Sequence, residues 1–372
     1  MGPNNIDRIE VYRVSVPLAE PWVTAGGSET SVETIYLKIC AGEYFGWGES
    51  CPMQYPLYSP EWSGGAYRLI TEVLAPNLLG KPAGSGDDIQ RLMDPVKGNP
   101  FAKAALDNAW WDLEARAAGQ PLWRFLGGDG EAVAAGASFG RVADVGELLR
   151  RVGKAIDAGA RRIKLKFANA SDLPAVEAVR RTFPGVDTHI DCNGSLDPGQ
   201  TAVFETLDGF GLKMVEEPLK GRDPAASAEL RRRITTPICL DESIGSFEEA
   251  KRAVELGACD WINLKPGRVG GVTEALRIYR LCRQSETGCW IGGMLETSLG
   301  VALLAALASL PGIAYPGDFN VRNGQPGDCG LCFPRQEYRT PYELMLSQRP
   351  GVGVEPDIGK LKAASLECAV VK

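Results

Sequence analysis

The sequence predicts an α/β protein that joins a barrel of βα units to a separate α+β domain. Its 372 residues exceed the usual size of one compact domain. Residues 129–324 alternate short apolar segments with amphipathic ones, and so many βα units favour a closed barrel over an open sheet. The flanking residues 1–128 and 325–372 lack this alternation. We therefore expect an N-terminal α+β capping domain, a barrel domain, and a C-terminal segment that returns to the first domain.

The N-terminal domain begins with two predicted strands, Arg8–Leu18 and Val32–Ile39. The Gly-containing stretch between them, Thr24–Thr30, is predicted to be a loop of a length that suits a mobile cover. Ala66–Leu79 and Lys103–Ala118 carry apolar residues at helical spacing. Helices packed on strands give the expected α+β domain.

The barrel domain is read from its apolar segments and the amphipathic segments between them. The predicted strands are Ala134–Phe139, Ile163–Phe167, Thr188–Asp191, Met214–Glu217, Ile238–Leu240, Trp261–Leu264 and Cys289–Gly292. The predicted helices include Val145–Ala158, Leu173–Thr182, Ala225–Arg232, Phe247–Leu256 and Val272–Glu286. The longest apolar run, Val301–Leu310, is too short for a membrane span and reads as a buried helix.

Composition and charge exclude several classes of protein. The formal net charge is -7 and no cluster of Lys and Arg is interleaved with aromatic residues, which argues against nucleic acid as a partner. The N-terminus lacks the basic and apolar blocks of a signal peptide and a lipidation motif. We therefore expect a cytoplasmic protein that does not bind a membrane. We also expect a homo-oligomer.

The cysteines and the lone histidine narrow the chemistry. The ten cysteines are scattered, and we expect mostly buried thiols. Cys329 and Cys332 form a single Cys-x-x-Cys, which without partners is a weak metal or redox motif. His189 is the only histidine, so a triad or a multi-histidine metal site is excluded unless it uses this residue. Although it lies two residues before Asp191, we expect a packed, hydrogen-bonded His189.

Five ionisable residues recur at the ends of successive predicted strands: Lys166, Asp191, Glu216, Asp241 and Lys265. Neighbours in this series are 24 or 25 residues apart, which is one βα unit. Because the carboxyl ends of barrel strands converge on one mouth, this spacing places all five side chains around one cavity. A set of surface salt bridges is the alternative, but solvated charges rarely repeat in register at strand ends.

The three carboxylates Asp191, Glu216 and Asp241 come from adjacent strands and supply hard oxygen ligands on one side of the barrel. Without a cation they would repel one another strongly. The pattern therefore suits Mg²⁺, with Mn²⁺ as a substitute.

Lys164 and Lys166 lie two apart on one strand, so both should point into the barrel, with Lys265 across the mouth. Desolvation and neighbouring cations are expected to lower the pKa of such an ammonium, so that it can act as a general base. Snorkelling lysines are the alternative, but Leu165 is the residue expected to pack against the helices.

A cation opposite lysines fits removal of a proton next to a carboxylate. That hydrogen is very weakly acidic, and the resulting enediolate carries two negative charges that a divalent cation stabilises. Lysines on both faces of the α-carbon permit either 1,1-proton transfer or loss of a β-leaving group after deprotonation.

These residues lie in motifs that resemble the muconate lactonising subgroup of the enolase superfamily. The motifs are Lys-x-Lys, Asp-x-Asn (191–193), Glu-Glu-Pro (216–218), Asp-Glu-Ser (241–243) and Lys-Pro-Gly-Arg-Val-Gly-Gly (265–271). Three further motifs narrow the resemblance to the o-succinylbenzoate synthase and N-succinylamino acid racemase family: Gly-Trp-Gly-Glu (46–49), Pro-Leu-Tyr-Ser-Pro-Glu (56–61) and Gly-Gly-Met-Leu-Glu-Thr (292–297).

The resemblance implies a modified TIM barrel, (β/α)7β, with an N-terminal α+β capping domain completed by the C-terminal segment. It implies that Asp191, Glu216 and Asp241 bind Mg²⁺, that Lys166 and Lys265 are acid/base lysines, and that Lys164 tunes Lys166. The candidate contacts of the substrate or of the metal ligands are Asn193, Ser138, Arg268, Glu242, Gly292, Met294, Glu296, Tyr55 and Trp22. Strand alternation should point Glu217 away from Glu216, and Glu242 away from Asp241.

The expected substrate is a small-molecule carboxylate, and two reactions remain open. One is dehydration of a cyclohexadiene carboxylate by an o-succinylbenzoate synthase, a carbon-oxygen lyase of menaquinone biosynthesis. The other is racemisation of N-succinylamino acids at the same site. Gly300 is followed directly by Val301 and not by an arginine, and Ser28–Glu33 contains no arginine, so how a distal carboxylate is held stays open. A muconate cycloisomerase and a non-catalytic binding protein fit less well. A dipeptide epimerase also fits less well, because it should show Asp-x-Asp where this chain has Asp318-Phe319-Asn320.

Overall fold

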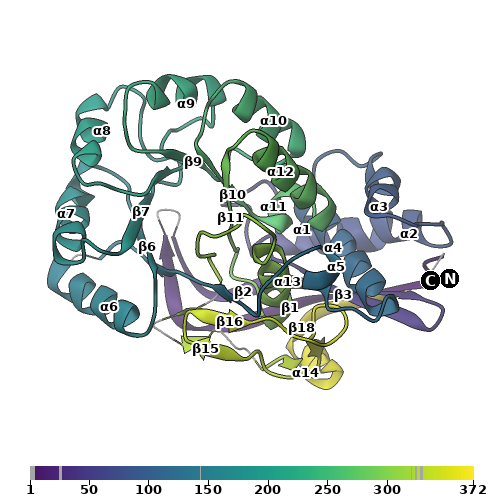
Figure 1. The fold of residues 1–372 in the computed structure, drawn as a ribbon. Coiled ribbons are helices and arrows are strands. Elements are labelled where there is room, and N and C mark those ends of the chain that lie inside the picture. The colour runs from purple at the N-terminus through teal and green to yellow at the C-terminus, as the bar shows by residue number, and fades with distance from the viewer. Residues whose placement is uncertain (1–4, 25–26, 143, 320, 323–324, 327–329) are drawn as a thin grey trace.

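The computed structural model describes residues 5–24, 27–142, 144–319, 321–322, 325–326 and 330–372. It contains a four-stranded antiparallel sheet and a seven-stranded parallel sheet, with smaller sheets formed mainly by the C-terminal part of the chain. Figure 1 shows the parallel sheet curled and covered on its outside by helices, with the antiparallel sheet beside it. Among the described residues, no helix combines the length and the hydropathy that crossing a bilayer requires.

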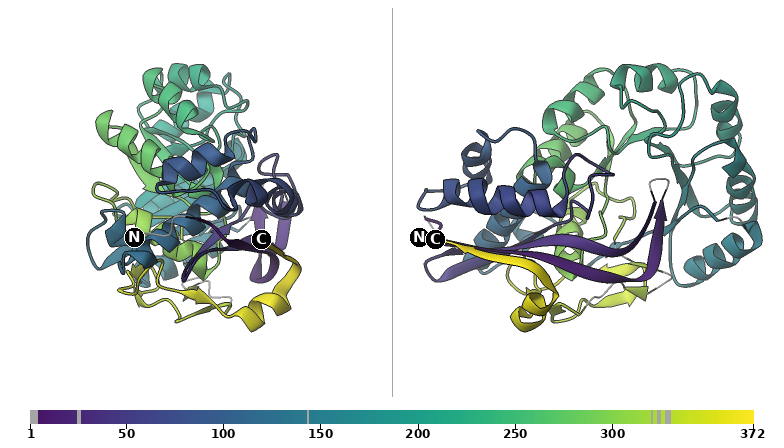
Figure 2. Two further views of the ribbon diagram at one scale, coloured as in Figure 1. Left: turned by 90° about the vertical axis from the view of Figure 1, so that its right-hand side faces the viewer. Right: turned by 180° about the vertical axis from the view of Figure 1, so that it is seen from behind.

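The antiparallel sheet has the strand order β18-β1-β2-β3. Its strands are β1 (Arg8–Thr24), β2 (Gly27–Ala41), β3 (Tyr44–Ser50) and β18 (Ser365–Val371). The prediction of a loop over Thr24–Thr30 was wrong, because Trp22 pairs with Glu29 and Thr24 with Gly27, while residues 25–26 lie outside the described ones. The hairpin bends toward the barrel in Figure 2. The register changes between Pro17 and Trp22, where such a bend can form.

The helices of this domain cover one face of the sheet. They are α1 (Ser63–Leu69), continued by a π-helical turn (Ile70–Leu74) and α2 (Ala75–Leu78), then α3 (Gly86–Met93), α4 (Pro100–Ala117) and α5 (Leu122–Phe125). Strand β3 lies directly against α4. A Cβ atom on Gly46 would lie 2.1 Å from the carbonyl oxygen of Ala109, and one on Gly48 would lie 2.3 Å from that of Ala105. This close approach therefore requires the two glycines of the Gly-Trp-Gly-Glu motif (46–49).

The parallel sheet has the sequential order β5 to β11. Its strands are β5 (Ala137–Phe139), β6 (Arg162–Lys166), β7 (Asp187–Asp191), β8 (Val215–Glu216), β9 (Ile238–Leu240), β10 (Trp261–Leu264) and β11 (Gly288–Ile291). Gly317 and Asp318 occupy the eighth position. Gly317 exchanges backbone hydrogen bonds with the 134–136 segment next to β5, and the Asp318 N–H donates to Ile291 O of β11 at 2.9 Å. These bonds complete the ring of the barrel.

The barrel helices lie between and outside the strands (Figure 1). They are α6 (Val145–Asp157), a 3₁₀ turn (Ala170–Asp172), α7 (Leu173–Thr182), α8 (Thr201–Asp208), α9 (Pro224–Arg231), α10 (Phe247–Glu255), α11 (Pro266–Val269), α12 (Val272–Gln284) and α13 (Ser298–Ala308). Side-chain oxygens of Asp144, Asp223 and Ser246 accept hydrogen bonds from the free N–H groups at the starts of α6, α9 and α10. The sequence predicted α6, α7, α9, α10 and α12 to within two residues at each end. It placed the start of α13 three residues late and missed α8 and α11.

The C-terminal segment runs back along the capping domain. Its elements are β12 (Val321–Arg322), β13 (Gln325–Pro326), β14 (Cys332–Phe333), β15 (Tyr338–Thr340), β16 (Glu343–Met345), β17 (Glu355–Pro356) and α14 (Ile358–Ala364), followed by β18. Strand β16 pairs with β4 (Ala132–Ala134). Strand β18 pairs with β1, with Val371 opposite Ile9, so the last strand of the chain lies beside the first one (Figure 2).

Buried carboxylates of the capping domain receive hydrogen bonds from the starts of two barrel helices. Glu49, the last residue of the Gly-Trp-Gly-Glu motif, accepts from Thr297 N at 2.9 Å and from Gly300 N at 2.7 Å, at the start of α13. Asp107 of α4 accepts from Thr273 N at 2.9 Å, at the start of α12. Both carboxylates satisfy N–H groups that have no partner within their own helix. They thereby fasten the capping domain to the barrel.

Candidate active site

Five charged side chains stand at the carboxyl ends of five adjacent strands. Lys166, Asp191 and Glu216 end β6, β7 and β8, and Asp241 and Lys265 follow β9 and β10 directly. Because the strands are neighbours in this order, the three carboxylates lie between the two lysines. The side chains of Asp191, Glu216 and Asp241 are at most 1% exposed. The arrangement matches the one expected from the spacing along the chain.

Asp191 is held by two lysines of β6. Its Oδ2 lies 2.7 Å from Nζ of Lys166 and 2.8 Å from Nζ of Lys164. Burial alone would raise the pKa of Asp191, but the two ammonium groups outweigh it and lower that pKa below its usual range. Asn193 completes the group, since its Oδ1 accepts from Lys166 at 2.6 Å. Asn193 has a φ of 45°, a left-handed conformation that turns the chain back toward Lys166.

Glu216 is completely buried and contacts three polar side chains. Its Oε1 accepts from Lys164 Nζ at 3.0 Å and from Asn263 Nδ2 at 2.8 Å. Its Oε2 lies 3.2 Å from Nε2 of His189. Burial and the charge of Asp191 raise the pKa of Glu216 to about 7. His189 is the packed, hydrogen-bonded residue that the sequence predicted.

Asp241 faces the opposite lysine. Its Oδ2 lies 2.9 Å from Nζ of Lys265, and its Oδ1 accepts from Arg268 Nη1. Arg268 also donates to two backbone carbonyl oxygens, so its guanidinium is fixed in place. Although burial opposes ionisation, Arg268 and Lys265 lower the pKa of Asp241. The hydroxyl of Tyr58, from the capping domain, accepts from Lys265 at 3.3 Å and from Arg268 at 3.1 Å.

The expected lowering of lysine pKa values was wrong for Lys164 and Lys265. Burial does lower them, but Asp191 and Glu216 raise the pKa of Lys164 well above its usual value, and Asp241 raises that of Lys265. The paired carboxylates lie within 3.0 Å of these ammonium groups, and their attraction outweighs burial. In the structure the lysines therefore serve as the counter-ions of the acidic groups.

Glu242 does not point away from the candidate site as expected. Its Oε1 accepts from Asn193 Nδ2 at 2.8 Å, and Asn193 also contacts Lys166. Strand β9 ends at Leu240, so strand alternation no longer applies to the turn that follows. Glu217 does lie away from Glu216: it accepts from Asp241 N at 2.8 Å and fixes that turn.

The donors around this site suit a divalent cation. Within the described residues, no three histidine, cysteine, aspartate or glutamate groups already lie as close together as around a bound metal ion. Three buried carboxylates are nevertheless the hard oxygen donors that Mg²⁺ prefers. Oε2 of Glu242 is a further buried oxygen without a hydrogen-bond partner in the described part of the chain. Asp191, Glu216 and Asp241 are therefore suited to holding such an ion.

The other candidate contacts have different positions. Ser138 donates to Asp318 Oδ1 at 2.7 Å. A Cβ atom on Gly292 would lie 2.0 Å from Oδ1 of Asn263, so this glycine leaves room for the side chain that contacts Glu216. Met294 is buried, and its N–H donates to Glu296 at 2.6 Å, which shapes the turn after β11.

Tyr55 and Trp22 are the two aromatic candidates for substrate contact in the capping domain. Tyr55 is 56% exposed, whereas Tyr58, three residues along, reaches Lys265. The backbone of Trp22 lies in β1, and its side chain lies outside the described residues. Of the two cysteines of the weak Cys-x-x-Cys motif, Cys332 is buried, and Cys329 lies outside the described residues.

Several residues of the site were not predicted from the sequence. Arg162 lies two residues before Lys164 on β6, and Asn263 of β10 lies two residues before Lys265, so strand alternation could have found both. Arg162 is fully buried and pairs with Asp318 at 3.3 Å, and Asp318 also lies 3.5 Å from Lys164. Nothing in the sequence predicted that Tyr58 would contact Lys265.

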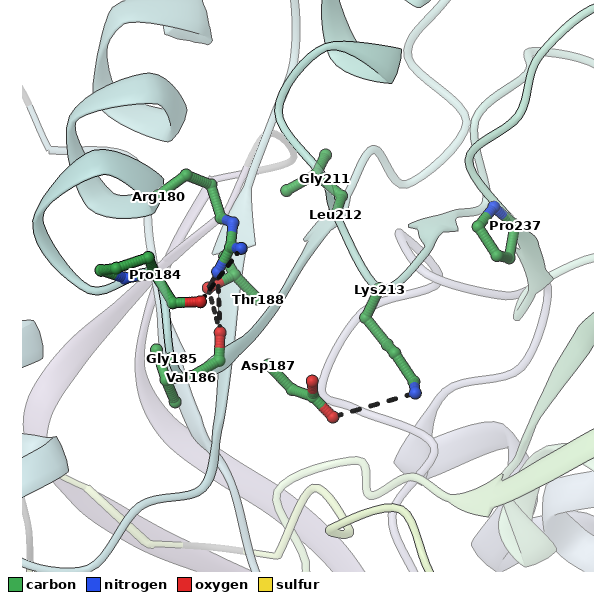
Figure 3. Close-up of a pocket in the computed structure, with 10 residues that line it drawn as sticks. All are labelled: Arg180, Pro184, Gly185, Val186, Asp187, Thr188, Gly211, Leu212, Lys213 and Pro237. Carbon is green, nitrogen blue, oxygen red and sulfur yellow. Dashed lines mark hydrogen bonds and ion pairs between the residues drawn. The ribbon is translucent and has the colours of Figure 1, made fainter.

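A separate pocket lies at the other end of the strands (Figure 3). It is formed near Asp187, the first residue of β7, whereas Asp191 is the last. Its charged groups have partners: Lys213 lies 4.0 Å from Asp187, and Arg180 donates to the carbonyl oxygen of Val186 at 2.8 Å. This pocket contains none of the five charged residues described above.

Comparisons with known proteins agree with this geometry. Residues 8–127 match the N-terminal domain family of mandelate racemase and muconate lactonizing enzyme, and residues 147–360 match the family described as enolase C-terminal domain-like. An N-succinylamino acid racemase of Amycolatopsis sp. is 38% identical over 354 residues, with 94% of each chain covered. An o-succinylbenzoate synthase of Geobacillus kaustophilus is 35% identical over 355 residues, covering 95% of this chain and 94% of that one.

A solved structure shares the whole fold. A crystal structure of an enolase superfamily member from Listeria innocua superposes with a TM-score of 0.93 at 31% identity and covers 99% of both chains. Together with the two family matches and the relatives above 30% identity, this likeness fixes the family. The chain belongs to the enolase superfamily, among proteins similar to o-succinylbenzoate synthase and N-succinylamino acid racemase.

Proposed function

We propose that this protein removes a proton next to a substrate carboxylate in an Mg²⁺-dependent reaction, most directly as an o-succinylbenzoate synthase. The observation that carries the proposal is the order of charges across five adjacent strands: lysine, three carboxylates, lysine. A cation site flanked by two possible proton-transfer groups is what this chemistry requires.

Asp191, Glu216 and Asp241 would hold the divalent cation, with Mn²⁺ able to replace Mg²⁺. The bound cation supplies positive charge that stabilises the negative charge developing on the substrate carboxylate, and it offsets the carboxylate charge that raises the lysine pKa values. Asn193 keeps Lys166 oriented through its 2.6 Å contact. Arg268 and Tyr58 do the same for Lys265 by fixing Asp241 and by covering the ammonium.

Lys166 and Lys265 are proposed to move the protons. In a dehydration, the lysine on the side of the α-hydrogen takes that proton, and a lysine can return it to the departing hydroxyl. In a 1,1-proton transfer, one lysine removes the proton and the other delivers one to the opposite face of the carbon. Lys164 is proposed to hold Asp191 and Glu216 in place and to raise the positive potential at Lys166.

N-succinylamino acid racemase is the second candidate, and the same site supports it. The relatives with 35–38% identity carry both names. The lysines stand on both sides of the carboxylates, as a racemase requires and a dehydratase does not.

The test is to incubate the protein and Mg²⁺ separately with the cyclohexadiene carboxylate and with N-succinylamino acids of both hands. Formation of o-succinylbenzoate with the larger kcat/KM supports the synthase. Faster racemisation would make the second candidate the main activity. Absence of both reactions in a folded, Mg²⁺-loaded protein would contradict the proposal.

A further inference from the structure

The only histidine of the chain lies directly beneath the candidate cation site. His189 is completely buried on β7 and pairs across to Lys164 on β6. Its Nε2 lies 3.2 Å from Oε2 of Glu216, and its Nδ1 lies 2.9 Å from the hydroxyl of Tyr315. Tyr315, His189 and Glu216 thus form a continuous chain of polar contacts inside the barrel.

These contacts lie beside two tryptophan rings, and the charged groups of Arg162 and Lys164 lie over the ring of Trp290. Trp290 packs edge-on against both rings, at 5.6 Å from His189 and 5.7 Å from Tyr315. The ring centre of Trp261 lies 5.6 Å from that of Tyr315. Water is poorly accommodated among such rings, so a polar atom that lost its partner here would stay unsatisfied. The contacts of His189 are therefore expected to be strong and directional.

The contact falls on the oxygen of Glu216 that the other side chains leave open. Oε1 already accepts from Lys164 and Asn263. Oε2 is hydrogen-bonded to Nε2 of His189 and, among the described residues, has no other hydrogen bond. The rotation of the carboxylate about its last bond is set by donors on both oxygens. Without His189 the carboxylate would be held from one side only.

The positions of the protons follow from the donor and acceptor properties. A carboxylate that binds a cation is ionised and can only accept hydrogen bonds, so Nε2 of His189 must carry a proton. In a neutral imidazole, Nδ1 is then an acceptor, and the Tyr315 hydroxyl donates to it. The direction of donation is Tyr315 to His189 to Glu216.

We propose that His189 is a positioning residue for the cation site, held in its Nε2-protonated tautomer by Tyr315 and orienting Glu216 as a ligand. The inference rests on the proposed function, because it treats Glu216 as a ligand. Hydrogen bonds to metal-ligating carboxylates orient them, and their removal weakens metal affinity about 10- to 100-fold.

The affinity test uses Mn²⁺, whose free form is measured by electron paramagnetic resonance. His189→Leu, which keeps bulk but has no donor, should raise the dissociation constant about 10- to 100-fold. His189→Gln places an amide N–H near the position of Nε2 and should stay close to wild type. Trp261→Phe is the matched control. Trp261 packs against the ring of Tyr315, and no contact of its side chain with His189 or Glu216 is described. Circular dichroism checks that each variant is folded.

Glu216→Gln separates this inference from the proposed function. If Glu216→Gln loses Mn²⁺ while His189→Leu binds Mn²⁺ like wild type, the positioning role is wrong and the cation site stands. The same conclusion follows if the Mn²⁺ affinity of His189→Gln falls as much as that of His189→Leu. If Glu216→Gln binds Mn²⁺ like wild type, the proposed cation site itself fails.

A second readout does not depend on any variant folding. Because the chain has one histidine, ¹⁵N-histidine labelling gives the two ring-nitrogen signals of a single imidazole in the Mg²⁺-loaded protein. The proposal expects a protonated Nε2 and an unprotonated Nδ1. A proton on Nδ1 alone would overturn it, since Nε2 could then not donate to Glu216.

Discussion

The hydroxyl of Tyr58 lies 3.3 Å from Nζ of Lys265, so the capping domain contributes directly to the group proposed for catalysis. The lysine also lies over the ring of Tyr58, at 5.1 Å from its centre. Burial and the charge of Asp241 raise the pKa of Tyr58 to about 12, so the hydroxyl is neutral at physiological pH. The capping domain thereby covers Lys265 and shields it from water.

Tyr58→Phe should lower kcat/KM about 5- to 10-fold, because one hydroxyl hydrogen bond contributes about 1 kcal/mol and the ring that covers Lys265 remains. Steady-state kinetics on the preferred substrate measures this. Tyr279→Phe is the control, since its hydroxyl contacts only the carbonyl oxygen of Pro311 among the hydrogen bonds described. An unchanged kcat/KM in Tyr58→Phe would show that the contact has no catalytic role.

Divalent cations should stabilise the fold through the three carboxylates. At about 100 times its dissociation constant, a bound ion adds about 2.7 kcal/mol to the free energy of unfolding. Thermal denaturation with and without Mg²⁺ should show this increase in the wild type and little in Asp241→Asn. Asp187→Asn, at the opposite end of β7, should keep the full Mg²⁺ effect. An equal Mg²⁺ effect in Asp241→Asn would place the cation elsewhere.

The junction between the domains should depend on Glu49. Its carboxylate also accepts from Thr34 Oγ1 at 3.0 Å and from Thr297 Oγ1 at 2.6 Å, in addition to the two N–H groups of α13. Glu49→Gln replaces one acceptor by a donor facing these groups and should lower the free energy of unfolding by about 2–4 kcal/mol. Urea denaturation measures it, with the exposed Glu43→Gln as control. A loss below about 0.5 kcal/mol would contradict the proposed anchoring.

Glu61 should give the protein a characteristic pH dependence. Its carboxylate accepts from Phe101 N at 2.9 Å and Ala102 N at 3.0 Å, yet burial raises its pKa to about 7. Between pH 4.5 and 7 the folded state then keeps a proton that the unfolded state has released. Stability from this group is present below about pH 4.5 and is lost as the pH rises to about 7.

Glu61→Gln, which does not titrate, should remove that slope. The difference in unfolding free energy between wild type and variant should change by about 2–3 kcal/mol from pH 5 to 7. Denaturant titrations at several pH values measure it. A difference that stays constant across this range would mean that Glu61 titrates normally in the folded state.

Much of the site was predictable because strands obey simple periodicities. The 24- or 25-residue spacing of Lys166, Asp191, Glu216, Asp241 and Lys265 placed these residues on successive strands, as the structure shows. The barrel strands Ile238–Leu240 and Trp261–Leu264 were predicted with their observed bounds. Such features depend on residues that are close in sequence.

Features that depend on contacts between distant segments were not predictable. The two long strands β1 and β2 continue to pair into the stretch Thr24–Thr30 that was predicted as a loop, with Trp22 opposite Glu29 and Thr24 opposite Gly27. The hydrogen bond from Thr297 N to the Glu49 carboxylate joins residues 248 positions apart. The lysine pKa values depend on distances to carboxylates on other strands, which decide whether burial or ion pairing is larger.

The most direct test of the central claim is exchange of the substrate α-hydrogen in deuterated water with Mg²⁺ and N-succinylamino acids. We expect deuterium to enter the α-position, chelation to abolish the exchange, and Lys166→Ala to slow it about 10²- to 10⁴-fold, the usual contribution of general base catalysis. Lys220→Ala, an exposed lysine that pairs with Asp197, should exchange like wild type. Full exchange after chelation, or in Lys166→Ala, would contradict the account.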